Sequence, residues 1–149
     1  MARLLIFVIL IFSFFFTFLC GSRGFFATDQ SIIFDGGYRI LLGQVPYRDF
    51  YLPFGPVSLW LQGLFFKVLG VNYRAYLLHA SILNLLFTLI LFLFLKTLIK
   101  KDGLAVYTGT AIGAIFFYPQ FGTPWFEQTT FFFTLISLYL LTRDRKSVV

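Results

Sequence analysis

The stretch from Tyr76 to Leu95 reads YLLHASILNLLFTLILFLFL, twenty residues without a charged side chain. At about 1.5 Å per residue, a helix of this length covers roughly 30 Å, which is the thickness of the hydrocarbon layer of a bilayer. Lys96 follows at once, and Lys100 and Lys101 come shortly after it. The stretch therefore predicts a transmembrane helix that ends at a membrane surface.

The composition of the whole chain agrees with a membrane protein. Its 149 residues are 59% hydrophobic and 12% charged, and 23 of them are phenylalanine. A soluble domain carries about 25% charged residues, so this chain has too little polar surface to cover itself in water. The net charge is +6, but no run of Lys and Arg forms a patch for nucleic acid. The basic residues flank apolar segments instead, where they set topology or meet lipid head groups.

Three further apolar runs predict spans near residues 4–20, 104–118 and 129–141. The first could also be a cleaved signal peptide. Its length, the lack of a small-x-small exit and the spans that follow favour an uncleaved helix. The run over residues 104–118 contains Gly109 and Gly113, a spacing that suits close helix–helix contact in lipid.

The basic clusters predict the sides of the membrane. With four spans, Arg3, Lys96–Lys101 and Arg143–Lys146 fall on one side, which the positive-inside rule makes cytoplasmic. The N-terminus is then cytoplasmic, and the long loop over residues 21–75 lies outside, as does the short Pro119–Glu127 loop. We expect one all-α integral membrane domain with about four transmembrane helices.

The outer loop has structure of its own in this prediction. Ser31–Leu42 reads as a short helix, with Thr28 or Asp29 as its N-cap and Gly43 as its stop. Pro56–Leu69 is apolar but short, and reads as an amphipathic helix at the outer interface, anchored by Trp60. The rival interpretation makes Pro56–Leu69 a true span, which would invert every later segment.

Several polar side chains gather on the predicted outer side, and each has an ordinary structural explanation as a cap, a turn residue or, for Asp35 and Arg39, a surface ion pair between residues four apart on a helix. Together they suggest chemistry, because acids can deprotonate a hydroxyl or hold a divalent metal ion and arginine can hold a phosphate. The members of this group are Asp29, Asp35, Arg39, Tyr47, Arg48, Asp49 and Glu127.

The order of motifs in this loop resembles a known family. Asp29-Gln30 is followed by Gly43, then by Pro46-Tyr47-Arg48-Asp49-Phe50 and by Gly55-Pro56. This order is similar to the first outer loop of the GT-C glycosyltransferases. More narrowly, it resembles the loop of the bacterial group akin to dolichyl-phosphate-mannose–protein mannosyltransferases and to lipopolysaccharide sugar transferases. The resemblance extends from about residue 4 to residue 141, with one residue fewer than usual before Gly43.

The resemblance implies an inverting transfer of a sugar from a polyprenyl-phosphate donor on the outer face of a bacterial inner (plasma) membrane. Asp29 occupies the position of the family's loop acid and would be the catalytic base. Tyr47, Arg48, Asp49 and Glu127 would contribute to substrate binding. Gln30 stands where the family often has glutamate, which removes one candidate ligand for a divalent metal, so a metal requirement stays open.

Family members have more spans and several hundred residues, so the resemblance implies an incomplete N-terminal part that needs further transmembrane segments or subunits. One alternative is a small non-enzymatic membrane protein that packs against a larger partner through Gly109 and Gly113. Another is a fragment of a flippase or transporter. The absence of acidic residues from the predicted spans speaks against that last alternative.

Overall fold

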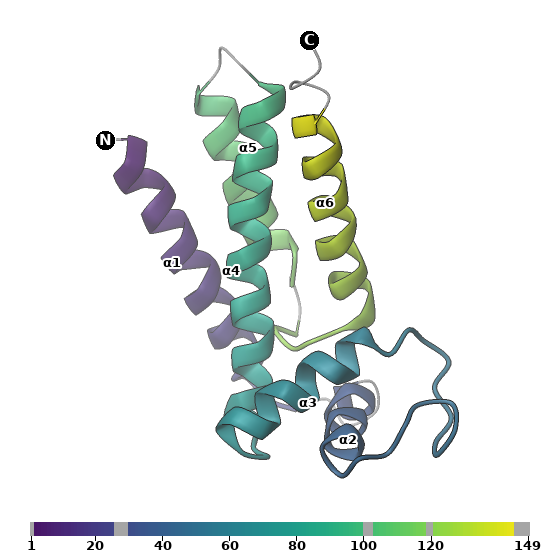
Figure 1. The fold of residues 1–149 in the computed structure, drawn as a ribbon. Coiled ribbons are helices and arrows are strands. Elements are labelled where there is room, and N and C mark those ends of the chain that lie inside the picture. The colour runs from purple at the N-terminus through teal and green to yellow at the C-terminus, as the bar shows by residue number, and fades with distance from the viewer. Residues whose placement is uncertain (1, 26–29, 100–102, 119–120, 145–149) are drawn as a thin grey trace.

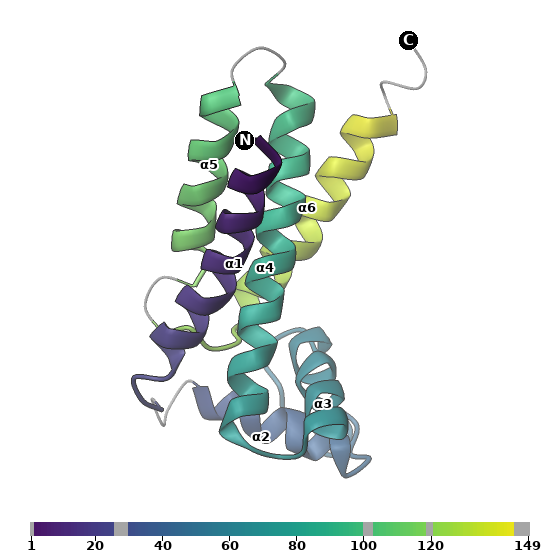
Figure 2. The same cartoon turned by 90° about the vertical axis from the view of Figure 1, so that its left-hand side faces the viewer.

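The computed structural model describes residues 2–25, 30–99, 103–118 and 121–144. These residues form six helices and no strand, as the sequence predicts for an all-helical chain. Four helices form an upright bundle, while α2 and α3 lie together at one end of it (Figures 1 and 2). The helices are α1 (Ala2–Gly21), α2 (Gln30–Leu41), α3 (Val57–Leu69), α4 (Tyr73–Leu98), α5 (Gly103–Phe116) and α6 (Phe126–Asp144).

Two of the described helices have the length and hydropathy needed to cross a membrane. They are α1, over Leu4–Gly21, and α4, over its whole length. The predicted segment 104–118 is helical over Gly103–Phe116 only, and these 14 residues extend about 21 Å, which is less than the hydrocarbon layer. The predicted segment 129–141 lies within α6.

Helix α4 is the centre of the bundle, because it packs against α1, α3, α5 and α6. It begins at Tyr73, three residues before the predicted start, because Asn72 caps it: the Asn72 side chain accepts a hydrogen bond from the Ala75 amide at 2.9 Å. Asparagine is among the preferred N-cap residues, so the earlier start has a local cause.

A buried asparagine joins three of the bundle helices. The Nδ2 atom of Asn84 in α4 lies 2.6 Å from Thr17 Oγ1 in α1 and 2.9 Å from the Ala114 carbonyl in α5. Asn84 and Thr17 are fully buried. An amide in an apolar interior is costly unless its donors are satisfied, so these bonds fix how the three helices pack.

Helix α3 is attached to the bundle by polar pairs as well as by apolar packing. The Gln62 Oε1 atom lies 2.9 Å from His79 Nδ1 in α4, and Ser58 donates to Thr129 of α6 at 2.9 Å. The helix begins after Pro56 and ends at Leu69, as predicted. It lies beside α2 at the end of the bundle (Figure 1).

Helix α2 ends as the sequence predicts. Gly43 has a φ of 81°, its amide donates to the Ile40 carbonyl, and the Gln44 amide donates to the Arg39 carbonyl. This pair of bonds is the Schellman arrangement, in which a residue in the left-handed region closes the helix. The expected N-cap residues Thr28 and Asp29 lie outside the described residues.

The end of α1 and the connection between α5 and α6 touch through two glycines. A Cβ atom at Gly122 would overlap the Thr17 carbonyl oxygen and the Gly21 amide nitrogen, and Gly122 has a φ of 58°. A Cβ atom at Gly21 would in turn overlap the Gly122 carbonyl. Backbone therefore lies against backbone at this junction, which leaves no room for a side chain.

Replacing Gly122 with alanine should lower the free energy of unfolding by about 2–4 kcal/mol, because the substitution adds left-handed strain to an overlap with backbone atoms. The thermal unfolding midpoint of the protein in detergent measures this change. Gly103→Ala is the matched control, since a Cβ atom there meets no atom within 4 Å. Equal midpoints for the two variants would contradict the close packing at Gly122.

Candidate functional site

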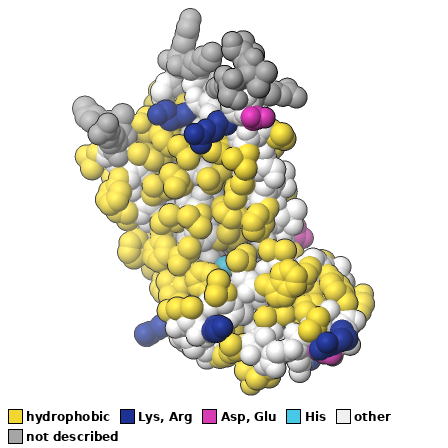
Figure 3. Space-filling model, in the orientation of Figure 1, with side chains coloured by type: hydrophobic (Ala, Val, Ile, Leu, Met, Phe, Trp, Pro, Cys, Tyr) yellow, Lys and Arg dark blue, Asp and Glu magenta, His cyan; other side chains and the backbone are white. Residues whose placement is uncertain are grey.

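The candidate site residues that the structure describes lie at one end of the bundle. Helices α2 and α3, the segment between them and the start of α6 all gather there (Figure 1). The surface of the molecule shows Lys and Arg side chains at both ends, with a mainly hydrophobic belt between them (Figure 3). On this face, the Lys and Arg side chains are therefore grouped at the two ends of the molecule.

The Pro46–Phe50 motif folds into a tight turn. The Tyr47 amide donates to the Phe50 carbonyl at 3.0 Å, and Tyr47 itself adopts a φ of 67°. Its hydroxyl donates to the Phe54 carbonyl at 2.6 Å. A non-glycine residue in the left-handed region is uncommon and needs support from its surroundings. The two hydrogen bonds of Tyr47 supply that support and link the turn to the chain before α3.

Arg48 and Asp49 form a two-pronged ion pair within this turn. Arg48 Nε donates to Asp49 Oδ1 at 2.9 Å, and Nη2 donates to Oδ2 at 2.8 Å. Asp49 Oδ2 also accepts the Val45 amide at 2.7 Å. The Arg48 hydrogen bonds and the Val45 amide lower the pKa of Asp49 to about 2, while Asp49 raises the pKa of Arg48. Both side chains therefore stay charged at neutral pH, and Asp49 organises the turn.

The turn should open in acid. The pKa of Asp49 is lower in the folded turn than its ordinary value of 3.8, so its stabilising effect is complete above that value and is lost as the pH falls toward 2. Hydrogen exchange at the Val45 amide is the readout, and its protection should hold down to about pH 4 and fall below it. In an Asp49→Asn variant we expect weak protection at every pH. Protection that persists in Asp49→Asn would show that another group holds the turn.

Asp29, the predicted base, lies outside the described residues, but the chain on both sides of the segment 26–29 is anchored to α4. The Tyr76 hydroxyl donates to the Gln30 carbonyl at 2.8 Å, and Tyr76 is fully buried. The Tyr73 hydroxyl lies 2.6 Å from the Gly21 carbonyl oxygen and 2.9 Å from that of Gly24. Hydropathy alone assigns no anchoring role to these two tyrosines. Their place at the polar start of an apolar helix is the signal that could have found them.

Glu127 lies in the first turn of α6 and is exposed. A carboxylate is favoured there by the positive end of the helix dipole. Together with Phe54, Gly55 and Thr130 it lines a groove of about 230 Å³. Glu127 therefore lines the same groove as Phe54, whose carbonyl accepts a hydrogen bond from the Tyr47 hydroxyl.

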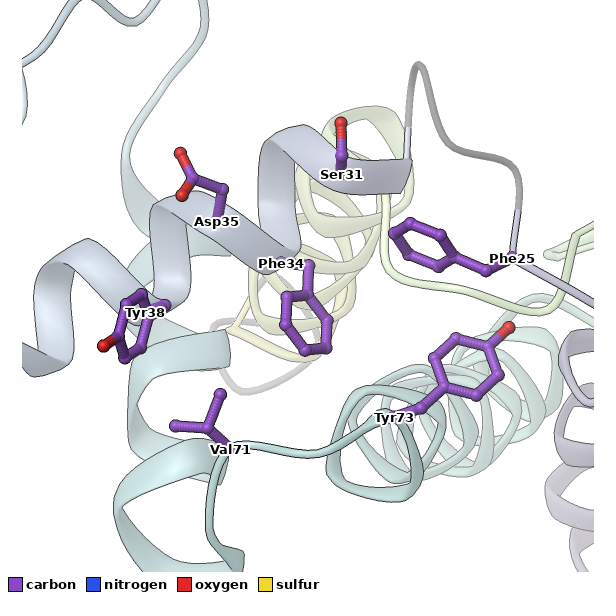
Figure 4. A pocket seen from close by; sticks show the side chains of 7 residues that line it. All are labelled: Phe25, Ser31, Phe34, Asp35, Tyr38, Val71 and Tyr73. Atoms are coloured by element: carbon purple, nitrogen blue, oxygen red, sulfur yellow. The ribbon is translucent and has the colours of Figure 1, made fainter.

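Two larger grooves flank α2, one on each side. The first, of about 560 Å³, is mainly aromatic, and Figure 4 shows Phe25, Phe34 and Tyr73 gathered on one side of α2. Asp35 and Ser31 point to the other side of the helix in the same view. The second groove, of about 540 Å³, also includes Ser31 and Asp35 and continues to Arg39. Helix α2 is therefore a ridge between an apolar groove and a polar one.

Within the described residues, no three His, Cys, Asp or Glu side chains lie close enough together to hold a metal ion. Asp29 falls outside this part of the chain, so the possible divalent metal stays a prediction.

Comparisons of the chain with protein-family models, with curated proteins and with solved structures return no match. The functional assignment therefore depends on the loop motifs and on the geometry of this end of the molecule.

Proposed function

We propose that this chain is the N-terminal part of a GT-C-type glycosyltransferase that moves a sugar from a polyprenyl-phosphate donor to an acceptor hydroxyl. The observation that carries the proposal is the order of the loop motifs: an acid at Asp29, a short helix closed at Gly43, and the Pro46–Phe50 turn. The ion-paired turn and the two grooves on α2 support it, because this end of the molecule offers charged groups and an apolar surface, and Phe50 of the turn lines one of the grooves.

The proposed reaction is a single displacement with inversion. A carboxylate, assigned to Asp29, takes the proton of the acceptor hydroxyl while the hydroxyl oxygen attacks the anomeric carbon of the donor sugar. The bond between that carbon and the phosphate oxygen breaks, and polyprenyl phosphate leaves with the electron pair. Tyr47, Arg48, Asp49 and Glu127 bind the substrates, with the Arg48–Asp49 pair fixing the turn that presents them.

The proposed topology has four spans, α1, α4, α5 and α6, in a bacterial inner membrane. The start of α1, the end of α4, the start of α5 and the end of α6 share one end of the bundle (Figures 1 and 2). Lys96 and Arg143 belong to that end, which supports a cytoplasmic position. Large apolar side chains on the bundle surface, such as Phe7 and Leu104, are more than half exposed and favour lipid as their solvent.

A non-enzymatic subunit is less well supported by the geometry. That alternative uses Gly109 and Gly113 as a contact face for a partner. In the structure, a Cβ atom at Gly109 would meet Leu95 of α4, and one at Gly113 would meet Leu91 of α4. The small-residue face is thus occupied within the chain.

The test of the proposal uses the protein expressed from the complete genomic reading frame and reconstituted in liposomes with polyprenyl-phosphate sugars and envelope glycans. Asp29→Asn should lower the rate of sugar transfer by about 10²–10⁴-fold, the usual contribution of a general base. Asp144→Asn, at the opposite end of the molecule, is the matched control and should leave the rate unchanged. Unchanged turnover in Asp29→Asn would remove Asp29 as the base, and no transfer by the unmodified protein would overturn the proposed function.

A further inference from the structure

The polar groove beside α2 has the dimensions of a small-molecule site. It lies between one face of α2 and the segment Phe50–Leu52, and Leu59 of α3 contributes to its lining. Its volume of about 540 Å³ falls within the range of about 300–1,000 Å³ that is typical of ligand pockets. Neither the turn residues Tyr47–Asp49 nor Glu127 line it, so this groove adds a different set of side chains to the site.

An ion pair supplies the hydrogen-bonding groups of the groove. Arg39 Nε donates to Asp35 Oδ2 at 2.6 Å, and Arg39 Nη1 lies 3.4 Å from Gln44 Oε1. These two bonds use Asp35 Oδ2 and Arg39 Nε and Nη1, and they leave Asp35 Oδ1 and Arg39 Nη2 for other partners. The groove therefore presents an acceptor and a donor side by side, which is the arrangement that two neighbouring hydroxyl groups of a sugar can satisfy.

The position of Arg39 is fixed before any ligand arrives. Its guanidinium carbon lies 5.5 Å from the centre of the Phe50 ring, a cation–π distance. Phe50 is held in turn by the Pro46–Phe50 turn, where its carbonyl accepts the Tyr47 amide. Such preorganisation lowers the entropy lost on binding.

Tyr51 adds an aromatic surface to the same groove. It is 87% exposed, the highest value among the exposed large hydrophobic residues, although its neighbour Leu52 is buried. An aromatic ring left in water beside a donor and an acceptor can cover the apolar C–H face of a sugar ring while the ion pair binds its hydroxyls.

We propose that this groove binds a neutral saccharide, which is the acceptor of the transferred sugar. The Asp35–Arg39 pair carries no net charge, and the Asp35 carboxylate would repel a phosphate, so a neutral polyol fits better than an anionic ligand. Its assignment as the acceptor rests on the proposed function, whereas binding of a saccharide does not.

Ligand-observed NMR on the detergent-purified full-length protein tests the proposal. The probes are the methyl glycosides of glucose, galactose, mannose and N-acetylglucosamine, with inorganic phosphate as the anionic comparison. At least one glycoside should bind saturably. Arg39→Met and Asp35→Asn should each raise its Kd about tenfold, as expected when a hydrogen bond to a charged group is lost.

Two further variants separate binding from folding. Tyr51→Ala should also weaken binding, and this exposed side chain can be removed without opening the core. Arg74→Met removes an exposed arginine outside the groove and should leave the Kd unchanged. Circular dichroism and size-exclusion chromatography confirm that each variant is folded.

Three results would overturn the inference: no saturable binding of any glycoside, a Kd unaffected by Tyr51→Ala and Asp35→Asn, or preferential binding of phosphate. Its failure is distinguishable from that of the proposed function. If Asp29→Asn abolishes transfer while Tyr51→Ala leaves the KM for the acceptor unchanged, the enzyme assignment stands and the groove assignment falls. If glycosides bind as expected but no sugar is transferred, saccharide binding by the groove stands and its assignment as the acceptor site falls with the proposed function.

Discussion

The Asn84 amide is the interaction on which the arrangement of the bundle depends most. This one side chain donates hydrogen bonds to Thr17 of α1 and to the backbone of α5, so it fixes the position of α4 relative to both helices. Among apolar helices such directional bonds decide which faces meet, because dispersion forces favour many packings almost equally. Once α4 is placed, the tyrosines at its start have a defined position, and the polar end of the molecule can be built around them.

Hydrogen bonds from α4 connect the bundle to the candidate site. Tyr73 and Tyr76 reach from the first turn of α4 to backbone carbonyls before and after the segment 26–29. The contact between Gln62 and His79 joins α3 to α4, and α2 packs against α3. The grooves on the two sides of α2 are thus tied to the bundle by several contacts, as a binding site requires if its groups are to meet a ligand in fixed positions.

Local sequence signals predicted most of the helices. Hydropathy and length predict α1 and α4, and Gly43 predicts the end of α2 to within one residue. The Asp35–Arg39 pair followed from its spacing of one helical turn. The predicted start of α4 is three residues too late, because hydropathy does not reflect the capping potential of Asn72.

The parts that could not be predicted depend on residues far apart in the chain. Asn84 and Thr17 are 67 positions apart, and the Tyr76 hydroxyl bonds a carbonyl 46 positions away. The polar groove likewise needs α2, the segment Phe50–Leu52 and α3 to be in place before Asp35 and Arg39 have a shared opening. Hydropathy and turn chemistry describe neighbours in sequence, so they carry no information on such partners.

The contact between Gly21 and Gly122 also constrains how the sequence can vary. Each residue excludes a side chain on the other, because the two backbones are in contact. A substitution at one position cannot be compensated by shrinking the other, since glycine is already the smallest residue. Chains that share this fold should therefore carry glycine at both positions together. That pair, about a hundred residues apart, would be a signature for finding distant relatives in which the apolar spans have diverged.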